Sequence, residues 1–495
     1  MTTSKWKPLF SLITINKNFK RTVATARTAV NIQTNLKPWR EIPGPSSMPV
    51  IGQFLHYLPG GDLANFEQAE MTMKLYEKYG PIIRLEKLFG RPPMLLLYDP
   101  EIAAHVFRSE NWTPLRPGFT TLAYYRKEKR KKTENSFRAS SLISDQGEIW
   151  KEFRSTVNPV MLQPKTIKLY STVLDGVAKD MIARMKANRD ENNMIRNNFD
   201  TEMNLWALES IGTVALGCRL NCLISDLPED SPERQLIQCI HGLFIAANDL
   251  DINPSLWRYY ETPLFKKTIN TYEKHEKLTK YFLQKGIDQL KHKTDNEKGV
   301  LEKLLEISEE AAFVMASDML FAGVDTAANA VTAILYLLAK NPEKQDKLRE
   351  EIMSKSERRP YLKACVKEAL RLMPVVSLNF RLTTKEYDIM GYTIPKDMSM
   401  MEHHYPKPRE FIPERWVIDK TDPLYYGNTH PFVYMPFGFG VRSCIGRRIA
   451  ELEIETFVAR AIENFRVEWI GPPPTVFHSA LNYIKGPFNF VFKNV

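Results

Sequence analysis

One cysteine has neighbours that indicate chemistry. The stretch "FGFGVRSCIGRR" places Cys444 after two glycines and Arg442, just before a segment whose apolar spacing predicts a helix. Backbone N–H groups and the helix dipole at such a position favour a thiolate over a thiol. The glycines leave room for a flat group close to the backbone, and the arginine adds a positive charge. The pattern therefore predicts a thiolate beneath a planar, anionic cofactor such as haem, whose iron accepts a single thiolate ligand.

The remaining cysteines lack these neighbours. Cys218, Cys222, Cys239 and Cys365 are scattered, and the chain contains no CxxC pair. A disulfide framework and a cysteine-rich zinc site are therefore both disfavoured, and a reducing compartment is favoured. We expect these four to be buried structural residues, an alternative that stays open for Cys444 when it is considered alone.

A long apolar segment contains the second chemical motif. Residues 309–340 include no proline and are almost wholly apolar, which predicts one helix buried at the centre of a large domain. Within it, "AGVDT" places Asp325 beside Thr326, and polar groups are costly there unless satisfied. Gly323 weakens the helix at this point, so an opening with an acid and a hydroxyl would suit proton delivery. The alternative is a threonine bonded to its own helix and an aspartate reaching solvent.

Three further stretches place charged residues at defined spacings. "WKEFR" puts Trp150 and Arg154 four residues apart, and "KEALRL" puts Glu368 and Arg371 three apart, so each pair shares one helix face. The charge run "RKEKRKKTEN", residues 126–135, is typical of an exposed loop. "YGPIIRLEKLFGRPPMLLLYDPE", residues 79–101, predicts a β-hairpin.

The spacing F-x-x-G-x-R-x-C-x-G from Phe437 to Gly446, with the other motifs in order, closely resembles the cytochrome P-450 family of haem-thiolate monooxygenases. The resemblance runs from about Ile42 to the end of the chain. It implies one domain over residues 41–495, mainly α with a minor β part, in which a long central helix lies over haem b beside a small β-sheet domain. It makes Cys444 the axial ligand of the haem iron, with Phe437 and Gly446 in the same haem-binding loop.

The resemblance assigns further roles, motif by motif. Asp325 and Thr326 would deliver protons during oxygen activation. The residues that would bind the haem propionates are Trp150, Arg154, Arg381 and Arg442, and His430 would lie near the same carboxylates. A structural network that holds the thiolate loop would consist of Glu368, Arg371 and Arg415 of "PERW".

The N-terminal residues predict an organelle leader. Residues 1–40 are basic and rich in hydroxyl side chains, contain no acidic residue and include an apolar run too short to span a bilayer. A disordered basic tail is the alternative. Arg447 and Arg448 after the cysteine, and "LKACVKEALRL", resemble the mitochondrial branch, and other stretches resemble insect detoxifying members. This implies an enzyme on the matrix side of the inner mitochondrial membrane.

The mitochondrial resemblance also implies redox partners. Electrons would come from an adrenodoxin-type ferredoxin and its reductase, with Lys363, Lys367, Arg447 and Arg448 as docking residues. The stretch 256–265, aromatic with a basic flank, is a candidate for contact with the membrane surface. We expect no nucleic-acid partner, although the net charge of the chain is +10.

We expect an enzyme that inserts one oxygen atom of O2 into a lipophilic substrate, a steroid or a foreign compound. Candidate pocket segments are residues 112–137, 244–251 and 375–380, which are rich in aromatic and apolar side chains. Two segments, near 353–360 and 398–405, are shorter than in relatives. A haem- or lipid-binding protein without turnover is therefore the alternative, and an isomerase of the same fold is another.

Overall fold

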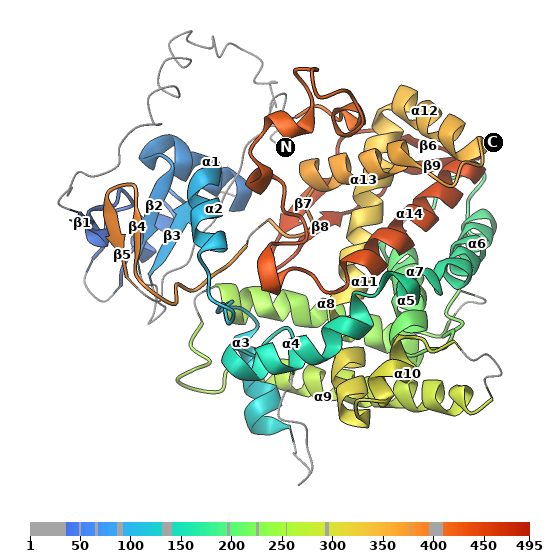
Figure 1. Cartoon of the computed structure of the whole chain (residues 1–495), viewed down its shortest axis with the longest axis horizontal. Coiled ribbons are helices and arrows are strands. Elements are labelled where there is room, and N and C mark those ends of the chain that lie inside the picture. Colours follow the sequence, from blue (N-terminus) through green and yellow to red (C-terminus); the bar gives the residue numbers. More distant parts are fainter. Residues whose placement is uncertain are drawn as a thin grey trace, which may run out of the picture.

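The computed structural model combines a large helical body with a smaller β-rich part (Figure 1). It describes residues 36–48, 51–64, 68–86, 93–130, 141–195, 199–223, 227–253, 255–292, 297–377, 379–395 and 409–495. Helices dominate and the strands are short, so the expected mainly α fold with a minor β part is confirmed.

The β-rich part lies beside α1 (Gln68–Tyr79) and α2 (Pro100–Arg108), at the left of Figure 1. It holds a sheet of order β1-β5-β4, made from β1 (Lys37–Pro38), β4 (Tyr387–Ile389) and β5 (Tyr392–Ile394). The expected hairpin over residues 79–101 is confirmed, because β2 (Ile82–Leu85) and β3 (Met94–Leu97) pair antiparallel. Its turn lies outside the described residues.

The sheet includes residues that precede residue 41, where the domain was expected to begin. Lys37 and Pro38 pair in parallel with Tyr392 and Thr393, and Trp39 packs against the apolar cluster under this sheet. Ordered structure therefore begins before residue 41, because these residues supply an edge strand. The leader expected over the preceding residues lies outside the described part of the chain.

The helical body is built around α11 (Glu309–Lys340), the helix expected over residues 309–340. The other helices of this body are α3 (Thr120–Tyr124), α4 (Gly147–Met161), α5 (Pro164–Lys168), α6 (Ser171–Ala187), α7 (Phe199–Ala215), α8 (Pro232–Ala247), α9 (Pro263–Leu290), α10 (Val300–Leu305), α12 (Pro342–Met353), α13 (Pro360–Leu372) and α14 (Arg447–Asn464). Two antiparallel strand pairs follow α14, namely β6 (Phe465–Trp469) with β9 (Phe490–Asn494), and β7 (Thr475–His478) with β8 (Asn482–Lys485).

The central helix α11 is continuous and mostly buried. Ser308 caps its first turn by accepting the Ala311 N–H at 2.9 Å. By length and composition α11 could cross a membrane, but within the described chain it is mainly enclosed by other helices, as a core helix is. Gly323 does not interrupt it. A Cβ at this position would lie 2.7 Å from Ile211 Cγ1 of α7, so this glycine permits close helix packing.

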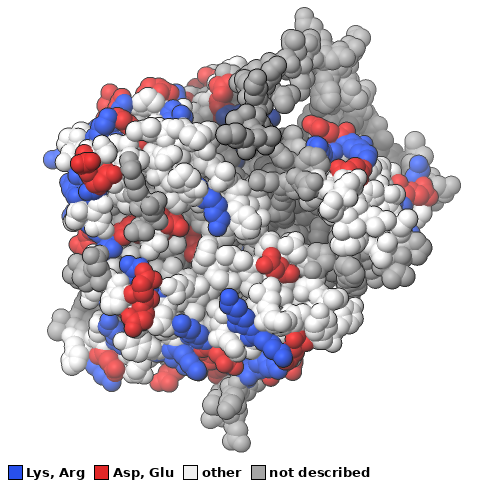
Figure 2. All heavy atoms as spheres, turned by 180° about the vertical axis from the view of Figure 1, so that it is seen from behind, with Lys and Arg blue, Asp and Glu red and all other residues white. Residues whose placement is uncertain are grey.

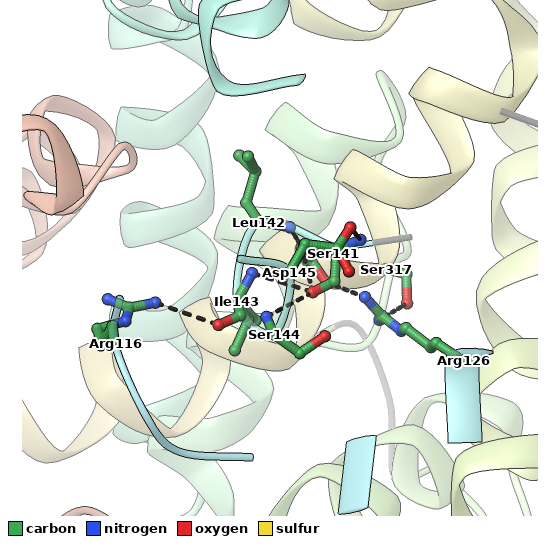
Figure 3. A network of polar contacts seen from close by, with 9 residues as sticks. Arg116, Arg126, Ser141, Leu142, Ile143, Ser144, Asp145 and Ser317 are labelled. Atoms are coloured by element: carbon green, nitrogen blue, oxygen red, sulfur yellow. Dashed lines mark hydrogen bonds and ion pairs between the residues drawn. The ribbon is translucent and has the colours of Figure 1, made fainter. Parts of the chain in front are cut away.

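The charge run expected in an exposed loop starts inside the protein, which corrects that prediction. Arg126 lies in η4 (Tyr125–Lys129) and is buried. Its Nη1 donates to Asp318 Oδ1 at 2.6 Å and its Nη2 to Ser317 Oγ at 2.9 Å (Figure 3). The N–H of Leu142 and the hydroxyl of Ser141 donate to the same aspartate. Asp318 therefore ties both flanks of the 131–140 segment, itself outside the described residues, to α11.

The first of the two short segments forms a compact turn between α12 and α13. Glu351 of α12 accepts the N–H groups of Tyr361 at 2.8 Å and Leu362 at 2.9 Å, so it caps the start of α13. The second, near 398–405, lies outside the described residues. On the face seen in Figure 2, Lys and Arg side chains are interspersed with Asp and Glu.

Candidate haem-thiolate site

The cysteine loop turns sharply just ahead of α14. Gly438 and Gly440 adopt positive φ values of 69° and 67°, a region that favours glycine. The Cys444 N–H donates to the Phe437 carbonyl at 2.8 Å and closes the loop. Gly446 then forms the N-cap of α14, so Cys444 lies two residues before the cap. The loop therefore presents the sulfur at the amino end of a helix.

Cys444 is exposed, whereas the other four cysteines are buried, as expected of structural residues. Protein still encloses the sulfur on its other sides, and this desolvation raises the pKa of the thiol above its ordinary value. The Gly446 N–H and the guanidinium groups of Arg154 and Arg116 act in the opposite direction. These groups favour the thiolate, as expected, whereas desolvation favours the thiol. A bound metal ion would itself deprotonate the thiol.

Three residues expected to bind propionates hold buried donors with no partner in the described part of the chain. These donors are Trp150 Nε1, Arg154 Nε and Arg442 Nη1. Arg442 stacks on Trp150, with its guanidinium carbon 3.6 Å from the ring centroid, and its Nη2 donates to Gln146 Oε1 at 2.8 Å. Arg154 donates to the Ser443 carbonyl at 2.9 Å. Unpaired buried donors are costly, so their grouping beside the cysteine loop fits an anionic ligand.

The sequence-based assignment missed Arg116. It precedes α3, and its positive charge acts on Arg442, Arg154, Arg381 and Cys444. Burial and the neighbouring arginines lower the pKa of Arg442 to about 8, and burial with Arg381 lowers that of Arg116 to about 10. No motif marks Arg116 in the chain. Arginines that repel one another are stabilised by negative charge between them, and the two propionates of haem would supply it.

Arg381 and His430 lie on the side of this cluster that faces α2. Arg381 Nε lies 2.6 Å from Glu110 Oε1, and its Nη2 donates to the Phe439 carbonyl at 3.2 Å. His430 accepts the Phe432 N–H at its Nδ1, and its Nε2 lies 3.7 Å from the exposed Glu101. Arg381 is thus attached to the thiolate loop, whereas His430 faces the outer surface of α2.

The structure brings Glu368, Arg371 and Arg415 together in one buried network. Arg415 Nε donates to Glu368 Oε1 at 2.9 Å, and Arg371 forms two bonds of 3.0 Å to the same carboxylate. The Trp416 indole also donates to it at 2.9 Å, a contact that the sequence analysis did not name. This carboxylate therefore joins α13 to η6 (Pro413–Trp416).

The acid and the hydroxyl of α11 face different surroundings. Ala322 is exposed, and Gly323 and Thr326 are half-buried, so a helix that is otherwise buried has one accessible face here. Thr326 donates to the Ala322 carbonyl at 2.6 Å. Asp325 is fully buried, contrary to the alternative in which it reaches solvent, and its Oδ2 accepts the Tyr483 hydroxyl at 2.5 Å.

Phe321, which precedes Ala322, belongs to an aromatic group with Phe244 of α8 and with Phe119, the residue that precedes α3. Phe119 meets Phe321 of α11 edge-on at 5.5 Å, and Phe244 of α8 stacks on Phe321 at 4.6 Å. Phe119 and Phe244 belong to two of the expected pocket segments. Phe244 and Phe321 are buried and Phe119 is half-buried, so the group is part of the apolar interior that adjoins Ala322 in the chain.

The expected docking residues lie on the two neighbouring helices α13 and α14. Lys363, Arg447 and Arg448 are exposed, and Lys367 is half-buried with its Nζ 5.4 Å from the Trp416 ring centroid. Arg447 also pairs with Glu451 at 2.9 Å. These cations therefore lie near the helix that follows the cysteine loop.

These features together are those of the haem-thiolate class of proteins. They are a helical body, a central helix that carries an acid and a hydroxyl, and a cysteine in a glycine loop. The cytochrome P450 family model matches residues 42–490. The chain is 37% identical to cytochrome P450 CYP12A2 of Musca domestica, over 92% of each protein. It is 38% identical to the Drosophila melanogaster protein named "Probable cytochrome P450 12a5, mitochondrial", over 93% of this chain and 91% of that one.

The chain therefore belongs to the cytochrome P450 family, and it is a monooxygenase. This family carries haem, and the exposed Cys444 sulfur together with the unpaired donors of Trp150, Arg154 and Arg442 fits that group. The resemblance found in the motifs is confirmed.

Proposed function

We propose that this enzyme inserts one atom of O2 into a lipophilic substrate, using haem b and electrons from a mitochondrial ferredoxin. The observation that carries this proposal is the grouping of unpaired buried donors around the loop of Cys444. When bound, the haem supplies the redox chemistry, and the second oxygen atom leaves as water after two electrons and two protons are taken up.

Each residue group contributes a separate task. Cys444 would ligate the iron through its sulfur, and Trp150, Arg154, Arg381 and Arg442 would hold the propionates by charge-assisted hydrogen bonds. His430 is proposed near the same carboxylates, with Phe437 and Gly446 forming the loop. Thr326 and Asp325, both on α11, would deliver protons during oxygen activation.

The aromatic group of Phe119, Phe244 and Phe321 supports the proposal of an apolar substrate. Aromatic side chains contribute apolar area in defined orientations, which suits flat hydrocarbon skeletons such as steroids or foreign aromatic compounds. No polar side chain in this trio would hold a hydrophilic substrate.

A ferredoxin partner is supported by the cations of α13 and α14, three of which are exposed and one half-buried. Lys363, Lys367, Arg447 and Arg448 present positive charge on the side of the cysteine loop, and acidic partners are steered to such surfaces. The word "mitochondrial" stands in the names of six similar insect proteins, which supports the same compartment.

A peripheral position on the inner mitochondrial membrane, on its matrix side, is supported by the stretch between α8 and α9. Leu256, Tyr259, Tyr260 and Leu264 are exposed there, beside exposed Arg258, Lys266 and Lys267. Aromatic and apolar side chains with a basic flank suit an anionic membrane surface.

The reduced, carbon-monoxide-bound spectrum tests the site, and turnover tests the rest. We expect a red-shifted Soret band in the wild type and its loss in Cys444→Ala. With a ferredoxin and its reductase, steroid and xenobiotic panels should yield oxygenated products. A normal band without any product would instead favour a binding protein without turnover.

A further inference from the structure

Asp325 is the only buried carboxylate among the described residues of α11 besides Asp318, and its partners come from two distant elements. The Tyr483 hydroxyl of β8 donates to Asp325 Oδ2 at 2.5 Å. His241 of α8 places its Nδ1 at 3.3 Å from the same oxygen. The Tyr483 and His241 rings meet edge-on at 5.0 Å, so the three side chains form one cluster.

This cluster connects the centre of the fold to solvent. Asp325 is fully buried, whereas the His241 side chain is 38% exposed. A carboxylate in its ionised form only accepts, and in that form the 3.3 Å contact is one that His241 Nδ1–H donates. The other ring nitrogen is then free to exchange a proton with water, as imidazoles do in proton transfer.

The second oxygen of the Asp325 carboxylate is available to pass a proton on. Asp325 Oδ1 is buried and has no hydrogen-bond partner among the described residues. Tyr483 cannot supply the proton readily, because burial and the Asp325 carboxylate raise the pKa of its phenol far above the ordinary value. Tyr483 is therefore suited to holding the carboxylate in place, and His241 to exchanging protons.

We propose that His241 is the entry point through which solvent protons reach Asp325, and that Tyr483 positions the acid. In each cycle His241 takes a proton from water at Nε2, and the resulting imidazolium gives its Nδ1 proton to Asp325 Oδ2. The neutral ring then carries its proton on Nε2, and turning over brings an N–H back to face Asp325. The inference deepens the proposed function, on which it rests, by naming the solvent side of the Asp325 path. No sequence motif marks His241 or Tyr483.

The functional test compares His241→Gln with His241→Lys. Glutamine keeps an N–H donor for Asp325 but cannot carry a proton across, whereas lysine retains an acidic proton. A positioned proton donor contributes about 10²–10⁴-fold to the rate of a catalysed step. Because water replaces part of this effect, the product formed per electron should fall at least about threefold in the glutamine variant. Hydrogen peroxide should rise by the matching amount, and lysine should restore part of the coupling.

Tyr483→Phe and His292→Gln complete the set. Tyr483→Phe should lower coupling less than His241→Gln, because the donor path remains. His292 is an exposed histidine just beyond α9, and its replacement should leave coupling unchanged. Normal coupling in His241→Gln, or equal losses in its glutamine and lysine variants, would overturn the proposal. A wild type that forms no product would instead count against the proposed function.

A nuclear magnetic resonance measurement on histidine-¹⁵N-labelled protein tests the contact without turnover. His241→Gln identifies the resonances, and the wild-type ring should carry its proton on Nδ1. Asp325→Asn should shift those resonances, while the resonances of His292 should not move. An unprotonated Nδ1 in the wild type would overturn the proposed donor path.

Discussion

At Glu368 a single buried carboxylate holds together segments that lie far apart in the chain. Arg415 and Trp416, 47 and 48 residues away, both donate to it, and so does Arg371 on its own helix. A buried charge of this kind is costly once one partner is removed. Glu368 therefore holds η6 against α13 by charge-assisted bonds.

We predict that Glu368→Gln lowers the free energy of unfolding by about 3–5 kcal/mol, because an amide nitrogen would face two guanidinium groups. Glu451→Gln on α14 is the control, since its exposed pair with Arg447 contributes about 0–1 kcal/mol. Urea unfolding of both variants measures the difference. Equal losses would show that the network adds nothing beyond a surface ion pair.

At the scale of elements, α11 depends on close contact with α7. Gly323 lies where a Cβ would be 2.7 Å from Ile211 Cγ1 and 3.2 Å from its Cβ, so the two helices approach through this glycine. The same position adjoins Asp325 and Thr326. The packing that buries α11 and the opening that exposes Ala322 are thus set within one helical turn.

We predict that Gly323→Ala destabilises the protein by about 1–3 kcal/mol through overpacking against α7. Gly242→Ala in α8 is the matched control, because nothing lies within 4 Å of a Cβ there. That substitution should stabilise the helix by up to about 1 kcal/mol. Thermal melting separates the two, and the same sign for both would contradict the packing argument.

At the scale of the whole molecule, a buried histidine makes stability depend on pH. His275 of α9 is buried against Phe321 of α11, and its Nε2 has no partner in the described chain. Burial, together with the positive charge of Arg126, lowers its pKa from 6.5 to about 3. The folded protein therefore keeps this ring neutral while the unfolded chain protonates it.

We predict that stability contributed at His275 is fully present above about pH 6.5 and is lost progressively as the pH falls towards 3. His275→Phe removes this proton uptake and keeps an aromatic ring against Phe321. Melting temperatures measured between about pH 7 and pH 5 should therefore fall less in the variant than in the wild type. Parallel curves would refute the assignment.

Features that depend on local order along the chain can be predicted from the residues alone. The bounds of α11, the β2–β3 hairpin and the glycine loop of Cys444 each follow from spacing within a short stretch. Apolar periodicity and glycine conformations act over a few residues, so they can be read without knowing the fold.

Contacts between polar groups that lie far apart in the chain depend on how the elements pack. Arg126 stands in a charge run that predicts an exposed loop, yet it is buried because its partner, Asp318, lies 192 residues away. Arg116 lies near Arg154, Arg381 and Arg442, and His241 and Tyr483 reach Asp325 across 84 and 158 residues. A buried charge is tolerated only beside a partner, and packing between distant segments selects that partner.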